Sequence, residues 1–442
     1  MLRGKPYIGI ALAFLLFRKV SLMGIVQYLR QEFSFITGNY RILIISWMIM
    51  DLAMEMPVPN YQYYVQALGG SEFPMALGLI GLANFLAMAV VAFPGGYLAD
   101  KYGRRWLITT MTFGLTFSYV FFILAPSWHF ILLGTIVHSL CLIYQPALFA
   151  MVQDSLPEKR RGIGSSLIQM VHGTFNTPGP IIAGILLLEF GLIMSMRIVY
   201  LIVMLLFLTA AIWRLRLAET IKNTEPIRFR YFISSYPQAI KECCVDVWRI
   251  VPKSVLWLFV VQIMLMFANA QVNVINAIYA RDQLGVPEES WWLTFLPLLI
   301  TMMVASIPIG KTIDRIGPRI PLMLGPIVLC LSLLLFVHGD FSTILVSMSL
   351  NGIVFLLIMA SGMTLTANLV EPPNRGKVRG LLNFLGYVFT GVGMLLGNFL
   401  YNLVPQLPFY LAIGLTIPMV LVVFFRVRIA EKMGSCPIMT KS

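Results

Sequence analysis

Charged side chains are scarce in this chain. They make up 12% of the 442 residues, whereas apolar side chains make up 59%. So few charges cannot cover the surface of a soluble domain of this length. The five cysteines show neither the spacing of a metal site nor that of a disulfide framework. The sequence also lacks a phosphate-binding loop of the G-x-x-x-x-G-K-S/T type, which argues against direct ATP hydrolysis. We therefore predict no soluble enzyme, no cofactor and no metal.

Long apolar runs are abundant instead. A run of about 20 residues is long enough to cross roughly 30 Å of hydrocarbon as a helix. The sequence predicts an all-α membrane protein with twelve transmembrane helices. The predicted spans lie near 40–67, 75–97, 105–125, 129–153, 162–190, 194–216, 254–281, 290–311, 320–338, 342–369, 377–403 and 406–428.

The positive charges lie almost entirely on one side of these spans. The net charge is +13, and of the 32 lysines and arginines only Arg197 and Arg281 fall near the other face. Cytoplasmic loops of membrane proteins carry such an excess of basic residues. We therefore predict a multi-pass protein of the plasma (cell) membrane with both termini cytoplasmic. The basic excess predicts contact with membrane lipid and no binding of nucleic acid.

A short charged turn occurs twice. Residues 96–105 (GYLADKYGRR) return in altered form as residues 310–319 (GKTIDRIGPR), and Arg161-Gly162 returns as Arg375-Gly376. Both shifts are 214 residues (310 minus 96, and 375 minus 161), so two separate loops keep one register. The chain is therefore duplicated. Because each half has an even number of spans, the halves are expected to be parallel repeats with a substrate site between them near mid-membrane.

The duplication divides the chain into five parts. Two six-helix bundles are predicted, over 40–216 and 254–428, joined by a cytoplasmic middle loop, 217–253, that contains an amphipathic surface helix. Residues 1–39 are expected to form an interfacial segment on the cytoplasmic leaflet, with Met23 as an alternative initiator. Residues 429–442 are expected to form a cytoplasmic tail.

The repeated turn, with the pattern G-x-x-x-D-K/R-x-G-R/P-R, resembles the signature of the major facilitator superfamily. The likeness extends over all twelve spans and implies two bundles that rock about a central site. In each turn the aspartate can accept hydrogen bonds from arginines or a helix N-terminus, which would latch the cytoplasmic side in one state. The alternative is that the arginines only set the topology. The implied gate residues are Gly96, Asp100, Gly103, Arg104 and Arg105, and then Gly310, Asp314, Arg315, Gly317 and Arg319.

The glycines of the two turns have different expected roles. Gly103 and Gly317 stand where a tight reversal needs a positive φ. Gly96 and Gly310 are expected to let neighbouring helices approach closely.

A second, partial resemblance lies in span 5. Residues 179–184 (GPIIAG) are similar to the G-P-x-x-G-G core of the proton-driven efflux branch of that superfamily, although Ala183 replaces a glycine. The resemblance implies that Gly179, Pro180 and Gly184 form a packing motif of an efflux protein. Plain helix packing is the alternative, because glycine and proline are common in membrane helices.

Asp51 and Glu55 are the strongest candidates for chemistry within a span. They follow Arg41 by 10 and 14 residues, so both are expected near mid-membrane, and their spacing of four puts them on one helix face. Pro57 and Pro59 come next and predict a bend. Carboxylates inside a membrane usually face a cavity or a proton path. We predict that Asp51 and Glu55 couple transport to protons.

Two histidines could extend that path. His138 in span 4 and His172 in span 5 fall at mid-depth and could join a proton relay. A packed, hydrogen-bonded histidine is the alternative for each.

The second half carries amides where the first carries acids. A shift of 214 residues maps Glu55 to Asn269 and Gln62 to Asn276. The amides of span 7 recur at helical spacing, so they either face a shared cavity or bond between helices. We expect proton coupling in the first half and polar substrate contacts in the second. The cavity candidates are Gln62, Gln145, Gln262, Asn269, Asn273 and Asn276, with Asn84, Asn351 and Asn383 as further possibilities.

These features predict a secondary active transporter that works by alternating access, as a monomer, on a small-molecule substrate and protons. Proton-coupled efflux (antiport) of small amphipathic or cationic compounds is the favoured function. Proton-coupled or facilitated uptake of a small metabolite is the alternative. A transport-dead receptor and an intramembrane enzyme are remote alternatives, since neither would need duplicated gate turns.

Overall fold

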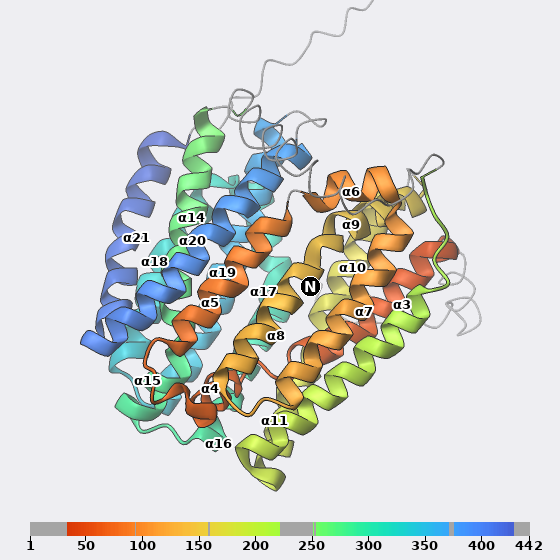
Figure 1. Ribbon diagram of the computed structural model, residues 1–442. Coiled ribbons are helices and arrows are strands. Elements are labelled where there is room, and N and C mark those ends of the chain that lie inside the picture. Colours follow the sequence, from red (N-terminus) through yellow and green to blue (C-terminus); the bar gives the residue numbers. More distant parts are fainter. Residues whose placement is uncertain are drawn as a thin grey trace, which may run out of the picture.

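The computed structural model describes residues 33–92, 94–157, 160–221, 251, 253–370 and 375–427. In this part of the chain the regular elements are all helices, and most of them run side by side in one bundle (Figure 1). Three sequence predictions lie outside the described residues: most of the interfacial segment 1–39, the amphipathic helix of the middle loop, and the C-terminal tail.

The first half contains the predicted spans in order, several of them broken. Its helices are α3 (Gly38–Met54), α4 (Tyr61–Val65), α5 (Ala76–Ala92), α6 (Pro94–Tyr102), α7 (Arg104–Ile123), α8 (Trp128–Cys141), α9 (Gln145–Ser155), α10 (Arg161–Phe175) and α11 (Pro178–Arg214). Helix α11 holds the second part of span 5 and all of span 6, separated by a kink at Gly191, whose φ is +68°.

The second half repeats this order. Its helices are α14 (Lys253–Asn273), α15 (Asn276–Leu284), α16 (Glu288–Trp291), α17 (Phe295–Ile316), α18 (Arg319–His338), α19 (Phe341–Leu369), α20 (Arg375–Leu403) and α21 (Leu407–Arg426). Among the described residues, nine helices are long and apolar enough to cross a membrane. The rest of the twelve are accounted for because the kinked α11 holds parts of two spans, span 1 is divided between α3 and α4, and span 2 contains the shorter apolar helix α5. The predicted fold class is confirmed.

The breaks in the helices fall where the sequence puts prolines or polar residues. Span 1 is interrupted between Met54 and Tyr61, around Pro57 and Pro59, and span 7 is interrupted between α14 and α15. In span 4 the α-helix changes to a single 3-10 turn at Leu142–Tyr144. Non-helical backbone is tolerated at membrane depth only where it is buried in protein or lines a cavity. The breaks in spans 1 and 7 therefore point to a cavity beside them.

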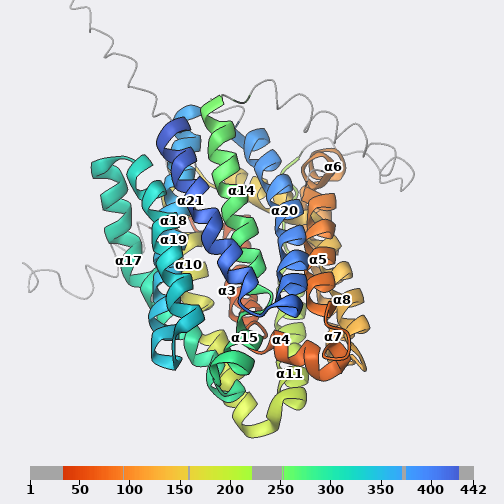
Figure 2. The ribbon, with the colours of Figure 1, turned by 90° about the vertical axis from the view of Figure 1, so that its left-hand side faces the viewer.

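The two halves meet along several helix pairs. Helix α5 lies against α20 in both views (Figures 1 and 2), and α4 contacts α15. At Gly81 of α5 an added Cβ would come within 2.4 Å of the Met394 sulfur, so a larger residue would have to displace the Met394 side chain of α20. Helix α11 also contacts α16 and the turn after it.

The ends of the bundle differ. One end, hereafter the basic end, carries the two repeated charged turns, between α6 and α7 and between α17 and α18. The opposite end carries α4, α15 and α16, and the pairs α4–α15 and α11–α16 join the halves there (Figure 1).

Candidate functional site: a cavity and a buried ion pair

A cavity of about 390 Å³ lies among the helices of the first half. That volume falls within the range of pockets that hold drug-sized ligands. Among the residues that line it, only Asn273, Val274 and Met394 come from the second half. The first half contributes Met54, Pro57, Val58, Tyr61, Gln62, Leu77, Ile80, Gly81, Asn84, Tyr119, Phe122, Thr135, His138 and Tyr200. The broken segments of spans 1 and 7 therefore line the cavity.

Aromatic rings form one wall of the cavity. The ring centroids of Phe122 and Tyr200 lie 4.9 Å apart, and Tyr119 lies 5.9 Å from Phe122 and 6.3 Å from Tyr200. All three side chains are almost fully buried. Ring faces attract organic cations as well as apolar groups. These residues could not be identified from the sequence, because lipid-facing and cavity-facing positions of a membrane span can both carry aromatic side chains.

The polar residues of the cavity wall are held by neighbours. Asn84 accepts a hydrogen bond from the Ser139 hydroxyl at 2.5 Å, and the Nδ1 atom of His138 lies 3.3 Å from the Ser118 oxygen. Gln62 and Asn273 reach the cavity from the two breaks. These groups offer fixed hydrogen-bond partners in an otherwise apolar space, which is the usual composition of a ligand site.

A close carboxylate–imidazole pair, with its carboxylate buried, lies one helical turn behind the cavity wall. The Oδ2 atom of Asp51, on α3, is 2.7 Å from Nδ1 of His172, on α10. The Asp51 side chain is 3% exposed and that of His172 is 33% exposed. The Trp47 ring packs at 5.7 Å against the His172 ring, in an edge orientation. The structure thus brings together one predicted acid and one predicted histidine.

Glu55 and His138 lie elsewhere. Glu55 directly follows α3 as its C-cap residue, and its backbone lies against the span 5 motif. A Cβ added to Gly179 would lie 3.0 Å from the Glu55 carbonyl carbon and 2.9 Å from the Met56 nitrogen. His138 lines the cavity, and no hydrogen bond or ion pair joins it to the Asp51–His172 pair within the described chain. Of the four proton-coupling candidates, Asp51 and His172 are thus in direct contact, Glu55 follows one helical turn after Asp51, and His138 lies in the cavity wall.

Gln62 joins the halves at the opposite end. Its amide nitrogen donates to the Asn273 carbonyl at 2.7 Å and to the Asn276 side chain at 2.8 Å, and its oxygen accepts from the Ala277 backbone. The Tyr63 hydroxyl donates to the Ala277 carbonyl at 2.9 Å. Gln62 and Asn276 are 214 residues apart, and so are Tyr63 and Ala277. Corresponding positions of the two repeats therefore face each other across the molecule.

A charged cluster reinforces this contact. Arg281 of α15 donates to Asp282 at 2.7 Å, to Glu288 at 2.6 Å and to the Gln66 side chain of the first half at 2.8 Å. Its guanidinium also lies 5.4 Å from the centre of the Tyr63 ring. We name the set Gln62, Tyr63, Gln66, Asn276 and Arg281 the clasp. The clasp holds the halves together at the opposite end.

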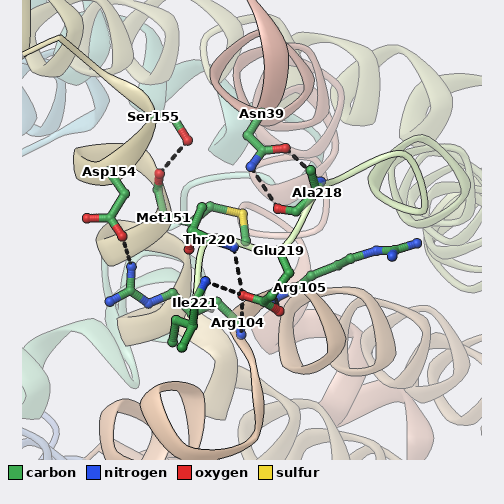
Figure 3. A network of polar contacts seen from close by, with 10 residues as sticks. All are labelled: Asn39, Arg104, Arg105, Met151, Asp154, Ser155, Ala218, Glu219, Thr220 and Ile221. Atoms are coloured by element: carbon green, nitrogen blue, oxygen red, sulfur yellow. Dashed lines mark hydrogen bonds and ion pairs between the residues drawn. The ribbon is translucent and has the colours of Figure 1, made fainter. Parts of the chain in front are cut away.

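At the basic end the first repeated turn is tied within its own half (Figure 3). The Glu219 carboxylate accepts hydrogen bonds from the backbone nitrogens of Arg104 and Arg105, at 3.2 and 2.9 Å, and so covers the N-terminus of α7. The Arg104 guanidinium forms an ion pair with Asp154 of α9. Asp100 lies on α6, and its side chain is outside what the structure describes.

The second repeated turn is more open. Asp314 and Arg315 are exposed, and Arg319 donates to the Phe424 carbonyl of α21. Gly103 and Gly317 have φ values of +105° and +80°, the positive values that the turn pattern predicts. The expectation for Gly310 is wrong, because a Cβ there would meet nothing within 4 Å. At Gly96 the nearest atom would be 3.7 Å away, whereas at Gly95 it would be the Ile143 oxygen at 2.1 Å. The closely packed glycine is therefore Gly95.

The remaining predicted residues lie apart from the cavity. Gln262 is buried on α14, where a Cβ added to Gly362 of α19 would lie 2.0 Å from its amide nitrogen. Gln145 begins α9, and Asn269 lies on α14. Pro180 is buried next to Gly179, and Gly184 packs under Trp292, 2.3 Å from where a Cβ would be. The span 5 motif thus touches span 1 at one glycine and the second half at another.

Comparison with known proteins gives the family. The Major Facilitator Superfamily model matches residues 43–303 and 258–435. The chain belongs to this superfamily and is a multi-pass membrane transporter.

Curated relatives are distant. The chain is 24% identical to the multidrug resistance protein MdtG of Escherichia coli O9:H4 (strain HS), over 81% of this chain and 86% of that protein. It is 26% identical to MdtG of Enterobacter lignolyticus (strain SCF1), over 74% of this chain and 76% of that protein.

Solved structures share the fold. The peptide transporter POT in complex with sulfate superposes with a TM-score of 0.70 at 14% identity, over 87% of this chain and 93% of that one. The human organic anion transporter MFSD10 (TETRAN) gives a TM-score of 0.64 at 18% identity, over 87% of this chain and 98% of that one. At these identities the likeness establishes the fold alone.

Proposed function

We propose that this transporter exports small amphipathic or cationic compounds across the plasma membrane in exchange for protons, working as a monomer with the basic end in the cytoplasm. The observation that carries the proposal is the buried Asp51–His172 pair, one turn from the broken segment of span 1 that lines the cavity. A proton-accepting group and a ligand cavity on the same helix are what coupled transport requires.

The charge of the pair supports coupling. With one proton shared between them, Asp51 and His172 are neutral overall; a second proton leaves a net charge of +1, and loss of the first leaves −1. A net charge is unfavourable inside a membrane protein and is better tolerated beside water. Each change in protonation therefore favours a state in which water reaches the pair. In this way proton transfer biases which side of the transporter is open.

The contacts between the halves support alternating access. The clasp closes the opposite end, which we place outside the cell because basic residues gather on the cytoplasmic side of membrane proteins. Relatives at 24–26% identity are named multidrug resistance proteins, which favours a foreign amphipathic compound as the substrate and export as the direction.

Proton flux in proteoliposomes tests this proposal. With a pH dye inside the vesicles and a panel of cationic drugs and metabolites outside, we expect a compound-dependent pH change. It should be lost in Asp51→Asn and in His172→Gln, because either change removes a proton site of the pair. Glu189→Gln is the matched control, since it removes an exposed carboxylate of α11 that lies in neither the cavity wall nor a repeated turn.

The sign of the pH change separates antiport from symport, so it also tests the alternative of metabolite uptake. Movement of a labelled compound against its gradient by the Asp51→Asn/Glu55→Gln double variant would contradict proton coupling through span 1. Movement of a labelled compound without any pH change would contradict proton coupling as a whole.

A further inference from the structure

The hydrogen bonds around His138 define which ring nitrogen carries the proton. The Ser118 hydroxyl donates to the Leu115 carbonyl at 2.6 Å, and a carbonyl oxygen can only accept. Since a hydroxyl has a single hydrogen and the contact with Leu115 is the shorter one, the Ser118 oxygen is left to accept from His138, whose Nδ1 lies 3.3 Å away. In the neutral imidazole Nδ1 is therefore the N–H donor, and Nε2 is the acceptor with a free lone pair.

The other ring nitrogen, Nε2, is the one left to meet an occupant of the cavity. His138 lines the cavity, and in the described part of the chain its only hydrogen-bond partner is Ser118. Several polar side-chain atoms of the described chain are fully buried and lack a hydrogen-bond partner, but the Nε2 atom of His138 does not belong to that set. The ring is fixed from the other side, because the Tyr119 ring packs against it at 5.4 Å in an edge orientation. The wall thus presents an oriented acceptor to whatever occupies the cavity.

The rest of the cavity wall makes this acceptor distinctive. No carboxylate is among the described residues that line the cavity. A charged imidazolium would have no acid to pair with there, so the neutral form of His138 is favoured. The aromatic rings of Tyr119, Phe122 and Tyr200 can attract a cation but cannot accept a strong, directional hydrogen bond. The side-chain oxygens of Asn84 and Gln62 already accept hydrogen bonds, from Ser139 and from the Ala277 backbone. A ligand cation is then recognised by the rings, and its N–H group, if it has one, by His138.

We propose that His138 is the specificity-determining residue of the cavity, and that through Nε2 it selects amphipathic compounds with an N–H or O–H donor, above all protonated tertiary amines. The inference rests on the proposed function, because it takes the cavity to be the substrate site. It gives His138 a different role from the proton relay, which is one of the two roles that the sequence leaves open.

A matched pair of ligands tests the inference. Imipramine is a tertiary amine that is protonated at neutral pH, and its N-methyl quaternary analogue keeps the charge and the rings but has no N–H. We expect the purified full-length protein to bind imipramine at least about tenfold more tightly than the analogue, measured by isothermal titration calorimetry, because one charge-assisted hydrogen bond is lost.

Three variants locate the effect. His138→Phe keeps a ring but has no acceptor, so it should bind both compounds with equal affinity. His138→Gln should keep most of the preference, since its side-chain oxygen can accept, and it also shows that the site tolerates substitution. Ser118→Ala should reduce the preference, because Nδ1 then loses the partner that fixes the proton on it.

The outcomes separate this inference from the proposed function. Equal binding of the two compounds by the unchanged protein, binding of neither, or an undiminished preference in His138→Phe would overturn the inference. If proteoliposomes show no proton-coupled export while the tenfold preference and its loss in His138→Phe are found, the inference stands and the proposed function fails.

Discussion

At the scale of single residues, the most unusual side chain is Arg214. It ends α11, is completely buried, and sits among the basic residues that mark one membrane face in the sequence. Its Nε donates to the Ser46 hydroxyl at 3.0 Å and one terminal nitrogen donates to the Thr112 hydroxyl at 2.8 Å, while the other has no partner among the described residues. The guanidinium lies 5.4 Å from the centre of the Tyr144 ring, in the 3-10 turn of span 4. A buried cation held only by neutral groups is unfavourable in itself.

This arrangement predicts the relative stability of two variants. Ser46 and Thr112 donate their own hydrogens to carbonyls of their helices, so removing the guanidinium leaves neither without an acceptor. Arg214→Met should therefore be milder than Arg214→Lys, which keeps a buried charge but cannot reach both hydroxyls or stack on Tyr144. We expect Arg214→Lys to lower the free energy of unfolding by roughly 2 kcal/mol or more. Thermal unfolding in detergent gives the order; a less stable Met variant would contradict this account.

At the scale of elements, the glycines of span 5 determine how closely α11 approaches its neighbours. Gly179 packs against the backbone that follows α3, where Glu55 and Met56 lie, and Gly184 packs against the Trp292 ring. The first contact is with backbone, which cannot move aside by rotating a side chain. The partial sequence likeness thus marks a packing role for these two glycines, and it does so through contacts that only the structure supplies.

The two glycines should respond differently to an added methyl group. We expect Gly179→Ala to displace α11 from the break in span 1, to destabilise the protein by about 1–3 kcal/mol, and to lower transport more than Gly184→Ala does, since the Trp292 ring can shift. Unfolding midpoints and transport rates measure both effects.

Gly414→Ala is the control for this pair. Gly414 is exposed on α21, and a Cβ there would meet nothing within 4 Å. Alanine has the higher helix propensity, so this variant should be unchanged or slightly more stable. A Gly179→Ala protein as stable and active as Gly414→Ala would show that the contact with span 1 is not tight.

At the scale of the whole molecule, the clasp is the contact that must open if the halves rock about the cavity. Arg281 contributes the only charged link to the first half within the described clasp, through Gln66. Its removal should weaken the closed state without touching the cavity. Interactions that couple such conformational states are typically worth 1–3 kcal/mol, so the ratio of the closed to the open state should fall by about five- to 150-fold.

Spin labels can follow this opening. Leu124, at the end of α7, and Leu403, at the end of α20, are exposed at the opposite end and belong to different halves. In a cysteine-free background, Arg281→Gln should increase the population of longer distances between labels at these positions. Arg197→Gln is the control, because Arg197 donates to Ala125 within its own half. Identical distance distributions for the two variants would mean that the clasp does not hold the closed state.

Much of this molecule could be predicted from its sequence. Apolar runs and a single repeat register define twelve spans and two halves, and prolines mark the break in span 1. The register even identifies partners, since Gln62 and Asn276 are bonded to each other. The aromatic wall and Arg214 could not be predicted, because neither residue type reveals which way it faces within a span. The prediction of close helix packing at Gly310 was wrong, because the repeated sequence pattern is not accompanied by a neighbouring helix at the same distance.

Position 62 contacts position 276, and position 63 contacts position 277. In each contact, a position of the first repeat faces the equivalent position of the second. In a pair of identical, unfused halves, one side chain would have to serve both sides of such a contact, so only self-complementary choices would work. Joining the halves in one polypeptide removes that restriction. Here glutamine faces asparagine, and a tyrosine hydroxyl faces the backbone of an alanine position. Fusion thus allows the two sides of this contact to be tuned separately, and with them the relative ease of opening and closing.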